Sequence, residues 1–308
     1  MPVSFSTKAA SRGSWVDAHH HLWDLERHPH YPWLADPQAQ AHFGDYRAIQ
    51  ANYTVERYRR DFQRTGLAKS VHCEAGWGGS DSVCETQWLQ EVGDRHGLPN
   101  GLVVPCRLEQ PDNVRQIDRH LQFNRVRGAR QLLFKPADMG SGDFAAAAIL
   151  QDPAWLRGFA ELARRQLSFD MQAIAPMMPA VQQLAQRFSD TPIVITHLGL
   201  PMDRSEEGLR QWKIGLETVA VCPNVTIKLS GLPMSDWHWT AKSIAPLIDI
   251  ALNAFGAQRI LVGSNFPVDG LHAWGASLID AYRSCIARLS PDEQHAILCT
   301  NAERVYRI

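Results

Sequence analysis

The sequence predicts a single α/β domain in which eight parallel strands, each followed by a helix, close into a (β/α)8 TIM barrel. Strand-like and helix-like segments alternate almost without exception along the chain. The apolar run at 192–196 is uninterrupted, which is typical of a parallel strand covered on both faces. The chain has 308 residues, a common size for one barrel, and no stretch of linker composition divides it. We therefore expect a flexible N-terminus at 1–14 and a barrel over 15–308.

Eight short runs of apolar and β-branched residues predict the strands of this barrel. They lie at 16–23, 68–75, 101–106, 128–135, 168–174, 192–196, 224–229 and 259–262. A doubly wound open sheet is the alternative, but it requires a glycine-rich phosphate-binding turn after the first strand. The chain instead continues into a long loop at 24–51 that is rich in Pro, Tyr, Trp and His. A loop of this length inside a compact domain is usually functional.

Helix-capping residues and apolar periodicity predict the intervening helices. A threonine opens the helix at 54–66, and a glycine ends it. Ser82 and Glu85 have the spacing of a capping box at the start of the second helix. Asp112 is the candidate N-cap of the third helix, and Asp152, which precedes a proline, is that of the fourth. Further helices are predicted at 179–188, 209–221 and 240–255, with a last helical region from 274 onwards.

Composition and charge exclude several classes of protein. The net charge of -1 provides no basic field for nucleic acid or an anionic membrane, and no apolar run reaches membrane-spanning length. The six cysteines show no short paired spacing, which predicts a reduced, cytoplasmic protein in which none of them is a zinc ligand. We expect a small-molecule substrate as the partner, and the helix faces of a barrel leave a homo-oligomer open.

Polar residues gather at the carboxyl ends of the predicted strands, where barrel enzymes place their active sites. His19 and His21 lie two residues apart on the first strand and therefore project from one face. In chain order the strand ends carry His19, His21, Glu74, Arg107, Arg130, Lys135, Asp170, Gln172, His197, Lys228, Ser230, Asn265 and Asp269. This gathering predicts a polar pocket. Taken singly, Asp170 and Lys228 can instead form an ion pair inside the barrel, and Glu74 can bind a backbone amide.

Motifs spread over nearly the whole chain resemble the amidohydrolase-related (amidohydrolase 2) family of TIM-barrel hydrolases. In order they are Asp17-Ala-His-His-His-Leu-Trp, Tyr31-Pro-Trp-Leu, Gly128-Ala-Arg-Gln, Phe169-Asp-Met-Gln, Thr196-His-Leu-Gly-Leu-Pro, Lys228-Leu-Ser-Gly-Leu, Gly263-Ser-Asn-Phe-Pro and Asn301-Ala-Glu-Arg-Val-Tyr. The resemblance is to the group of sugar-lactone and pyrone-dicarboxylate lactonases. It implies a barrel of the amidohydrolase-superfamily type that hydrolyses an ester within a ring.

The resemblance also implies a metal set that this chain retains in part. Superfamily relatives that bind metal use two histidines of strand one, a histidine each from strands five and six, and an aspartate of strand eight. His19, His21 and His197 match three of these positions, but Gln172 stands at strand five, and glutamine is a poor zinc ligand. Lys135 lies near the place of a carbamylated lysine and is interpreted as a substrate-charge or surface group. We favour a site without a metal cofactor; one divalent ion, Zn or Mn, held by the three histidines is the alternative.

The strand-eight position departs further from the family. Asn265 stands where the family has the aspartate that orients or deprotonates the attacking water. A neutral amide is no useful proton acceptor, so the general base is missing from its usual place. Three explanations are considered in this order: Asp269 reaches back from the same loop, Glu74 on strand two serves instead, or hydrolysis is lost and the pocket is kept for binding or another reaction.

These residues together predict a hydrolase that opens a lactone of a sugar acid or dicarboxylate by water attack at the barrel mouth. The three histidines polarise the carbonyl, a carboxylate activates water, and Arg130 binds a substrate carboxylate or carbonyl. The residues assigned to catalysis are His19, His21, His197, Asn265, Asp269 and Glu74. Those assigned to substrate binding are Arg130, Gln172, Lys228, Ser230, Trp33 and Trp77.

Two other functions remain open from the sequence. One is a metal-dependent amidohydrolase or decarboxylase of the same superfamily. The other is a non-catalytic ligand-binding relative, which Asn265 favours and the retained histidines and Arg130 oppose.

Overall fold

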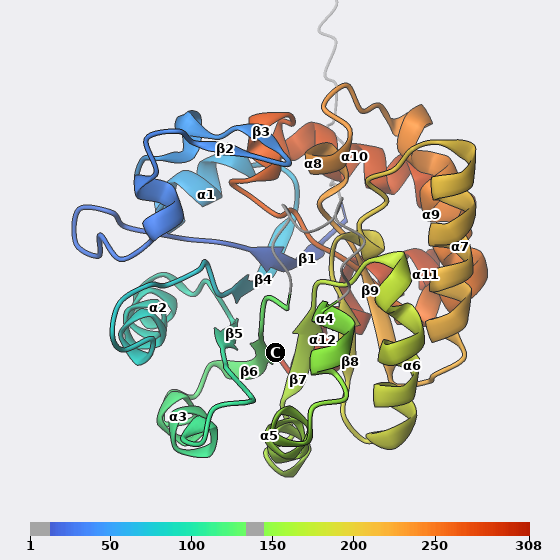
Figure 1. Ribbon diagram of the computed structural model, residues 1–308. Helices are drawn as coiled ribbons and strands as arrows, with labels where there is room; N and C mark the ends of the chain where they lie inside the picture. The colour runs from blue at the N-terminus through green and yellow to red at the C-terminus, as the bar shows by residue number, and fades with distance from the viewer. Residues whose placement is uncertain (1–12, 134–144) are drawn as a thin grey trace, which may run out of the picture.

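Eight parallel strands form one sheet in the order β1-β4-β5-β6-β7-β8-β9-β10, and in Figure 1 they surround a common axis. The computed structural model describes residues 13–133 and 145–308. The strands are β1 (Trp15–His20), β4 (Leu67–Cys73), β5 (Gly101–Pro105), β6 (Val126–Arg130), β7 (Ser168–Met171), β8 (Ile193–Ile195), β9 (Val225–Leu229) and β10 (Ile260–Val262). The predicted (β/α)8 barrel is confirmed.

The barrel closes between the first strand and the chain that follows the last one. The backbone N–H of Asn265 donates to the carbonyl oxygen of His19 at 2.7 Å, and the N–H of His21 donates to the carbonyl of Phe266 at 2.8 Å. Strand β10 is only three residues long, so these two bonds continue the closure beyond it. They also bring the residues of strands one and eight together at the barrel mouth.

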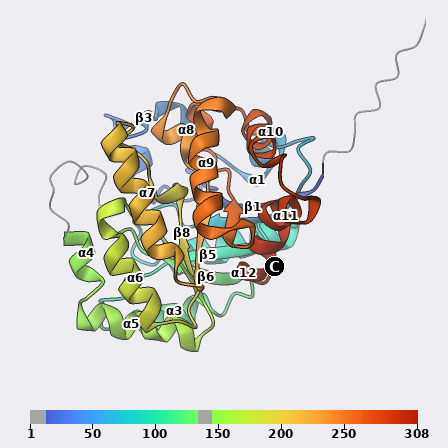
Figure 2. The ribbon, with the colours of Figure 1, turned by 90° about the vertical axis from the view of Figure 1, so that its right-hand side faces the viewer.

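Helices cover the outside of the barrel, and Figure 2 shows α6, α7 and α9 side by side along one wall. The longer helices are α1 (Val55–Asp61), α2 (Val83–His96), α3 (Asn113–His120), α5 (Pro153–Arg164), α6 (Met178–Arg187), α7 (Glu206–Ala220), α9 (Ala241–Phe255) and α10 (Gly275–Ile286). Shorter ones are α4 (Ala145–Ile149), α8 (Leu232–Ser235), α11 (Pro291–His295) and α12 (Asn301–Tyr306). Within the described residues, no helix is long and apolar enough to cross a membrane.

The helix starts agree with the sequence analysis at some positions and not at others. Asp152 caps α5, because its carboxylate accepts the backbone N–H groups of Ala154 and Trp155 at 2.8 and 2.9 Å. The capping box predicted at Ser82 and Glu85 is wrong, since the Ser82 side chain forms no capping hydrogen bond at the start of α2. The predicted cap at Asp112 is also wrong, because its side chain forms no such bond at the start of α3.

Glu85 is instead used to hold the long loop at 24–51. It is buried, and its carboxylate accepts a hydrogen bond from the Tyr31 hydroxyl at 2.9 Å. Ser82 meanwhile accepts a hydrogen bond from Gln116 on α3. A tertiary contact therefore takes the side chains that the local pattern assigned to a cap.

Two sequence predictions extend into residues outside the described part of the chain. The fourth strand ends at Arg130 in the structure, and the remainder of the predicted strand includes Lys135, which lies outside the described residues. The predicted flexible N-terminus falls almost wholly at 1–12, which also lie outside them.

Candidate active site at the barrel mouth

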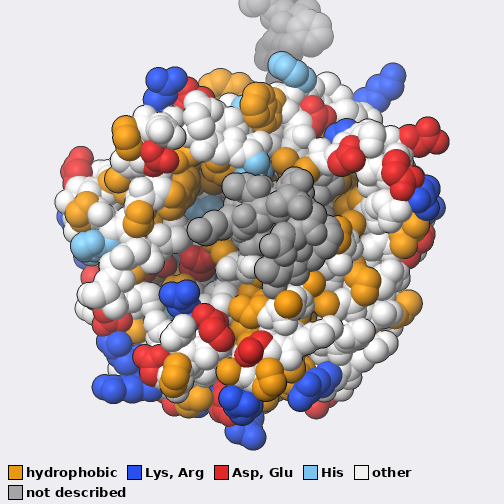
Figure 3. All heavy atoms as spheres, in the orientation of Figure 1, with side chains coloured by type: hydrophobic (Ala, Val, Ile, Leu, Met, Phe, Trp, Pro, Cys, Tyr) orange, Lys and Arg blue, Asp and Glu red, His pale blue; other side chains and the backbone are white. Residues whose placement is uncertain are grey.

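A pocket of about 330 Å³ opens at the carboxyl ends of the strands. Its polar lining residues come from strand ends far apart in the sequence: His21, Glu74, Arg130, Gln172, His197 and Asn265. Figure 3 shows this face of the molecule, on which hydrophobic and histidine side chains border a hollow. Seven of the twelve predicted site residues thus line one cavity, these six and Trp33.

The loop at 24–51 forms an apolar wall over this pocket. It contributes Trp33 and, around the hairpin of β2 (Gln40–Ala41) and β3 (Gly44–Asp45), His42, Phe43 and Tyr46. The indole N–H of Trp33 donates to the carbonyl of Ala75, and the Tyr46 hydroxyl donates to the carbonyl of Trp33. Both polar groups are therefore engaged within the protein, and these rings offer a ligand their apolar faces.

His42 is a pocket residue that the sequence analysis did not single out. Both of its ring nitrogens are buried and have no hydrogen-bond partner among the described residues. It lies in the hairpin of the loop, where no periodicity marks a site, so a histidine there carries no sequence signal. Trp77, by contrast, does not line the pocket and packs against His30 and Tyr31.

His21 is held with one nitrogen available to the pocket. Its Nδ1 lies 2.9 Å from the carbonyl oxygen of Cys73, and a carbonyl only accepts, so Nδ1 carries the hydrogen and Nε2 the lone pair. Burial, and next the nearby Arg130, lowers the pKa of His21 to about 3. The imidazole is therefore neutral at pH 7.

His197 is oriented by the residue after strand β9. Its backbone N–H donates to the Ser230 hydroxyl oxygen at 3.2 Å, and its Nδ1 lies 3.1 Å from the same oxygen. One arrangement that satisfies both contacts has the hydroxyl donating to Nδ1, which leaves the hydrogen of the ring on Nε2. Burial lowers the pKa of His197 well below its ordinary value. A Cβ at position 231 would lie 2.7 Å from Nδ1, and Gly231 has a φ of +66°, so both space and backbone require glycine there.

Arg130 and Glu74 bring one charge of each sign to the pocket. Their closest charged atoms are 3.6 Å apart, and both side chains are buried. Glu74 also accepts the backbone N–H of Gly76 at 2.8 Å, and Arg130 donates to the Gln172 side-chain oxygen at 3.2 Å. One of the two Glu74 oxygens therefore binds a backbone amide, as the sequence suggested as an alternative to a role in the pocket. The other oxygen faces the Arg130 guanidinium.

Asp269 lies behind Asn265 and does not line the pocket. Its two carboxylate oxygens accept hydrogen bonds from the Asn265 side-chain amide and the Gly231 backbone N–H, both at 2.9 Å. Burial raises the pKa of Asp269 to about 8. Asn265 itself has a φ of +53°, a left-handed conformation that asparagine tolerates better than most residues.

Lys228 and His19 lie beneath the pocket floor. Lys228 is 0% exposed and forms an ion pair of 2.5 Å with Asp170, so the ion pair weighed in the sequence analysis is present. The rings of His21 and His197 pack against that of His19, with centroids 5.1 and 4.6 Å away.

The described residues contain one group with metal-ligand spacing, and it is not the three histidines. His19, Cys73 and Asp170 have ligand atoms within 4.8 Å of one another. The sequence analysis did not count Cys73 among zinc ligands, because its spacing to other cysteines is uninformative. The place of Cys73 on β4 could have indicated that it points into the barrel, because side chains alternate across a strand and Cys73 lies on the same face as Val71.

Comparison with known proteins gives three findings. The model of the amidohydrolase family matches residues 16–308. The uncharacterized protein y4mH of Sinorhizobium fredii is 37% identical over 293 residues, which cover 95% of this chain and 98% of that protein. An L-fucono-1,5-lactonase of Burkholderia multivorans is 28% identical over 306 residues, covering 95% of this chain and 96% of the lactonase.

A solved structure shows the same fold. The crystal structure of an amidohydrolase from Burkholderia multivorans with bound zinc superimposes with a TM-score of 0.80 at 24% identity. The match covers 96% of this chain and 99% of that one. At this identity the likeness establishes the architecture alone.

Proposed function

This chain belongs to the amidohydrolase family, and on that basis we propose that it is a hydrolase that opens a lactone by water attack at the barrel mouth. One observation carries the proposal: Glu74, Arg130 and two neutral imidazoles meet in a single pocket. The match with the lactonase of Burkholderia multivorans covers 96% of that relative, and its name supports the same reaction.

The pocket offers a proton acceptor in Glu74. Of the two carboxylates weighed as the general base, Glu74 lines the pocket, whereas Asp269 lies behind Asn265, bonded to its amide and to the Gly231 N–H, and does not line it. In the proposed step Glu74 takes a proton from water while the water oxygen bonds to the lactone carbonyl carbon. The carbon–oxygen bond of the ring then breaks, and the departing alkoxide takes that proton, which yields a hydroxy acid.

The pocket also carries donors for the oxyanion. The Nε2–H of His197 and the guanidinium of Arg130 stabilise the negative charge that develops on the carbonyl oxygen. Because the pKa of His197 is lowered, it donates as a neutral imidazole. His21, with a lone pair on Nε2, accepts a hydrogen bond from a substrate hydroxyl or from the attacking water.

The charge balance of the pocket supports a sugar lactone over a dicarboxylate. Among the described lining residues Arg130 is the cation and Glu74 the anion, so the formal charges cancel. Lys228, expected from the sequence to bind substrate, is paired with Asp170 below the floor. A doubly charged lactone lacks a second cation here, whereas a neutral polyhydroxylated ring with one apolar face fits the aromatic wall.

The proposed reaction also implies a partner and a compartment. We propose a small-molecule substrate and a cytoplasmic location. The six cysteines are free thiols in the structure, which supports a reducing compartment.

The test is a panel of lactones assayed with protein treated with a chelator. We expect hydrolysis of L-fucono-1,5-lactone or another neutral hexonolactone, with 2-pyrone-4,6-dicarboxylate turned over at least about tenfold more slowly. Acid release is followed with a pH indicator. Tight binding without turnover across the panel contradicts the enzymatic proposal and identifies a ligand-binding relative. Turnover that appears only after zinc or manganese is added contradicts the metal-independent mechanism.

A further inference from the structure

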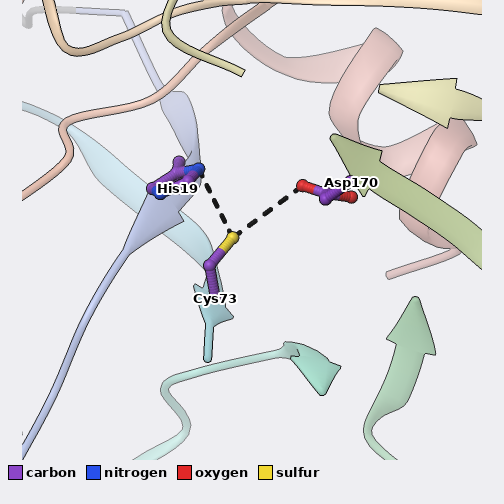
Figure 4. Close-up of side chains that lie close together, drawn as sticks. All are labelled: His19, Cys73 and Asp170. Atoms are coloured by element: carbon purple, nitrogen blue, oxygen red, sulfur yellow. Dashed lines mark hydrogen bonds between the residues drawn. The ribbon is translucent and has the colours of Figure 1, made fainter. Parts of the chain in front are cut away.

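A lysine ammonium lies inside the group of side chains that has metal-ligand spacing. The Lys228 Nζ is 2.5 Å from Asp170 Oδ2, 3.4 Å from His19 Nδ1 and 3.7 Å from Cys73 Sγ. Figure 4 shows the three surrounding side chains, with the Cys73 sulfur between His19 and Asp170. Each atom of the candidate ligand set is therefore in contact with one internal cation.

This lysine is enclosed by groups that compensate its charge. Lys228 and Asp170 are both 0% exposed. The Tyr306 hydroxyl lies 3.0 and 2.9 Å from the two Asp170 oxygens, and the Tyr306 ring centroid is 5.2 Å from the Lys228 nitrogen. A buried charge is tolerated only with such partners, so the surroundings are built for a cation at this position.

The same contact fixes which nitrogen of His19 carries the hydrogen. An ammonium group only donates, so His19 Nδ1 accepts from Lys228 and the hydrogen of the neutral ring is on Nε2. A metal ligand must offer a lone pair, and in this arrangement His19 has none to spare. A divalent ion among these atoms would also lie about 4 Å or less from the ammonium, a separation at which like charges repel strongly.

From these contacts we propose that Lys228 takes the place of a metal ion among His19, Cys73 and Asp170 and is a positioning residue for His19. It supplies the positive charge beneath the pocket floor, holds His19 in the Nε2–H tautomer and excludes a metal from the set His19, Cys73 and Asp170. Removal of the ammonium leaves an imidazole, a thiol and a carboxylate, a donor combination that suits zinc. The proposal concerns cation binding and stands apart from the lactone reaction.

The first experiment measures cobalt binding, because a cobalt–thiolate bond gives a charge-transfer band in the near ultraviolet. We expect Lys228→Met to bind one equivalent of Co²⁺ with this band, and Zn²⁺ at least about 100-fold more tightly than the unchanged protein. The double variant Lys228→Met with Cys73→Ser should lose the band. Lys242→Met, which removes an exposed lysine on α9, is the matched control and should behave as the unchanged protein. A Cys73-dependent band in the unchanged protein overturns the proposal, as does a folded Lys228→Met that binds no metal.

The second experiment needs no substitution at position 228, so it decides the question even when that variant fails to fold. Nitrogen-15 NMR of histidine-labelled protein reports the tautomer of each ring, and His19→Gln assigns the His19 signals. We expect an unprotonated Nδ1 and a protonated Nε2 at His19 in the metal-free protein. The opposite tautomer overturns the role given to Lys228. Neither experiment uses turnover, so its outcome is independent of whether the protein hydrolyses lactones.

Discussion

The side-chain amide of Asn265 donates a hydrogen bond of 2.9 Å to the carboxylate of Asp269. Asn265 stands in place of the family aspartate, and Asp269 is the carboxylate that the sequence suggested as a substitute for that aspartate. The contact joins the two. Asp269 is fully buried behind the amide and accepts a second bond from the Gly231 backbone. Its geometry therefore serves to orient Asn265 and the turn after β9, and it leaves Glu74 as the carboxylate that reaches the pocket.

Asn265→Asp should lower activity, although it restores the residue usual in the family. The new carboxyl group would face that of Asp269 at hydrogen-bond distance. Two carboxyl groups so close cannot both ionise, because their negative charges repel. We expect a fall in kcat/KM of about tenfold, together with a lower midpoint of thermal unfolding. Activity assays and calorimetry on one preparation check both effects.

A double variant provides the matched control for this substitution. Asn265→Asp combined with Asp269→Asn exchanges amide and carboxylate and can re-form a bond between them. It should recover much of the lost stability. A rise in activity for Asn265→Asp alone contradicts our interpretation, because it means that the pocket lacks only its usual base.

Glu85→Gln should remove a pH dependence of stability. Burial, and next the charge of Glu74, raises the pKa of Glu85 to about 8, above its ordinary value of 4.5. The folded protein thus holds a proton that the unfolded chain releases between these values. The stability from this group is present below about pH 4.5 and lost as pH rises towards 8. The amide still accepts the Tyr31 hydroxyl and carries no charge, so Gln at this position should be more stable than Glu by about 1–3 kcal/mol near pH 8.

Urea unfolding near pH 5 and pH 8 measures this difference. Glu207→Gln, on the exposed surface of α7, is the control and should leave the pH profile unchanged. Equal pH profiles for Glu85→Gln and the unchanged protein would mean that Glu85 is ionised in the folded state.

The sequence was sufficient for the fold and for most of the pocket floor, because strand alternation and strand ends place side chains by simple geometry. Arg130, Gln172 and His197 were all assigned to strand ends from the sequence, and all three line the pocket. Lys228 shows the limit of this reasoning. Alternation places it on the inner face of β9, but whether an inner residue reaches the mouth or lies below the floor depends on its height along the barrel.

The loops carry the information that the sequence does not reveal. Asp269 follows Asn265 by four residues, and only the left-handed backbone of Asn265 and the turn after it decide that the carboxylate lies behind the amide. His42 reaches the pocket from the turn between β2 and β3, in a loop without periodicity. Both placements depend on tertiary contacts rather than on local pattern.

His42→Ala should weaken substrate binding more than it slows the chemical step. The residue lines the pocket, and its two buried ring nitrogens have no partner among the described residues, so we expect a bound hydroxyl to satisfy one of them. We expect KM to rise by about 5–10-fold with little change in kcat. His28→Ala, on the same loop but outside the pocket lining, is the matched control. A fall in kcat without a change in KM contradicts this role.

His197→Ala should reduce kcat, because it removes the proposed donor to the oxyanion. Loss of one such donor typically costs about 100-fold or more. His197→Gln keeps a donor of similar reach and should retain more activity than the alanine variant. Unchanged kinetics in His197→Ala would remove this residue from the mechanism, and circular dichroism checks that the variant is folded.

Glu74→Gln should affect catalysis most strongly among these variants. Glutamine keeps an oxygen that can accept the Gly76 N–H but cannot take a proton from water. We expect kcat to fall by at least about 100-fold with KM within about threefold of the unchanged value, since the size and contacts of the side chain are preserved. Glu109→Gln, at the neighbouring strand end and outside the lining residues, serves as the control. Full activity of Glu74→Gln would contradict the role of Glu74 and return Asp269 to consideration as the base. Loss of activity in Asp269→Asn would then identify Asp269 as the base.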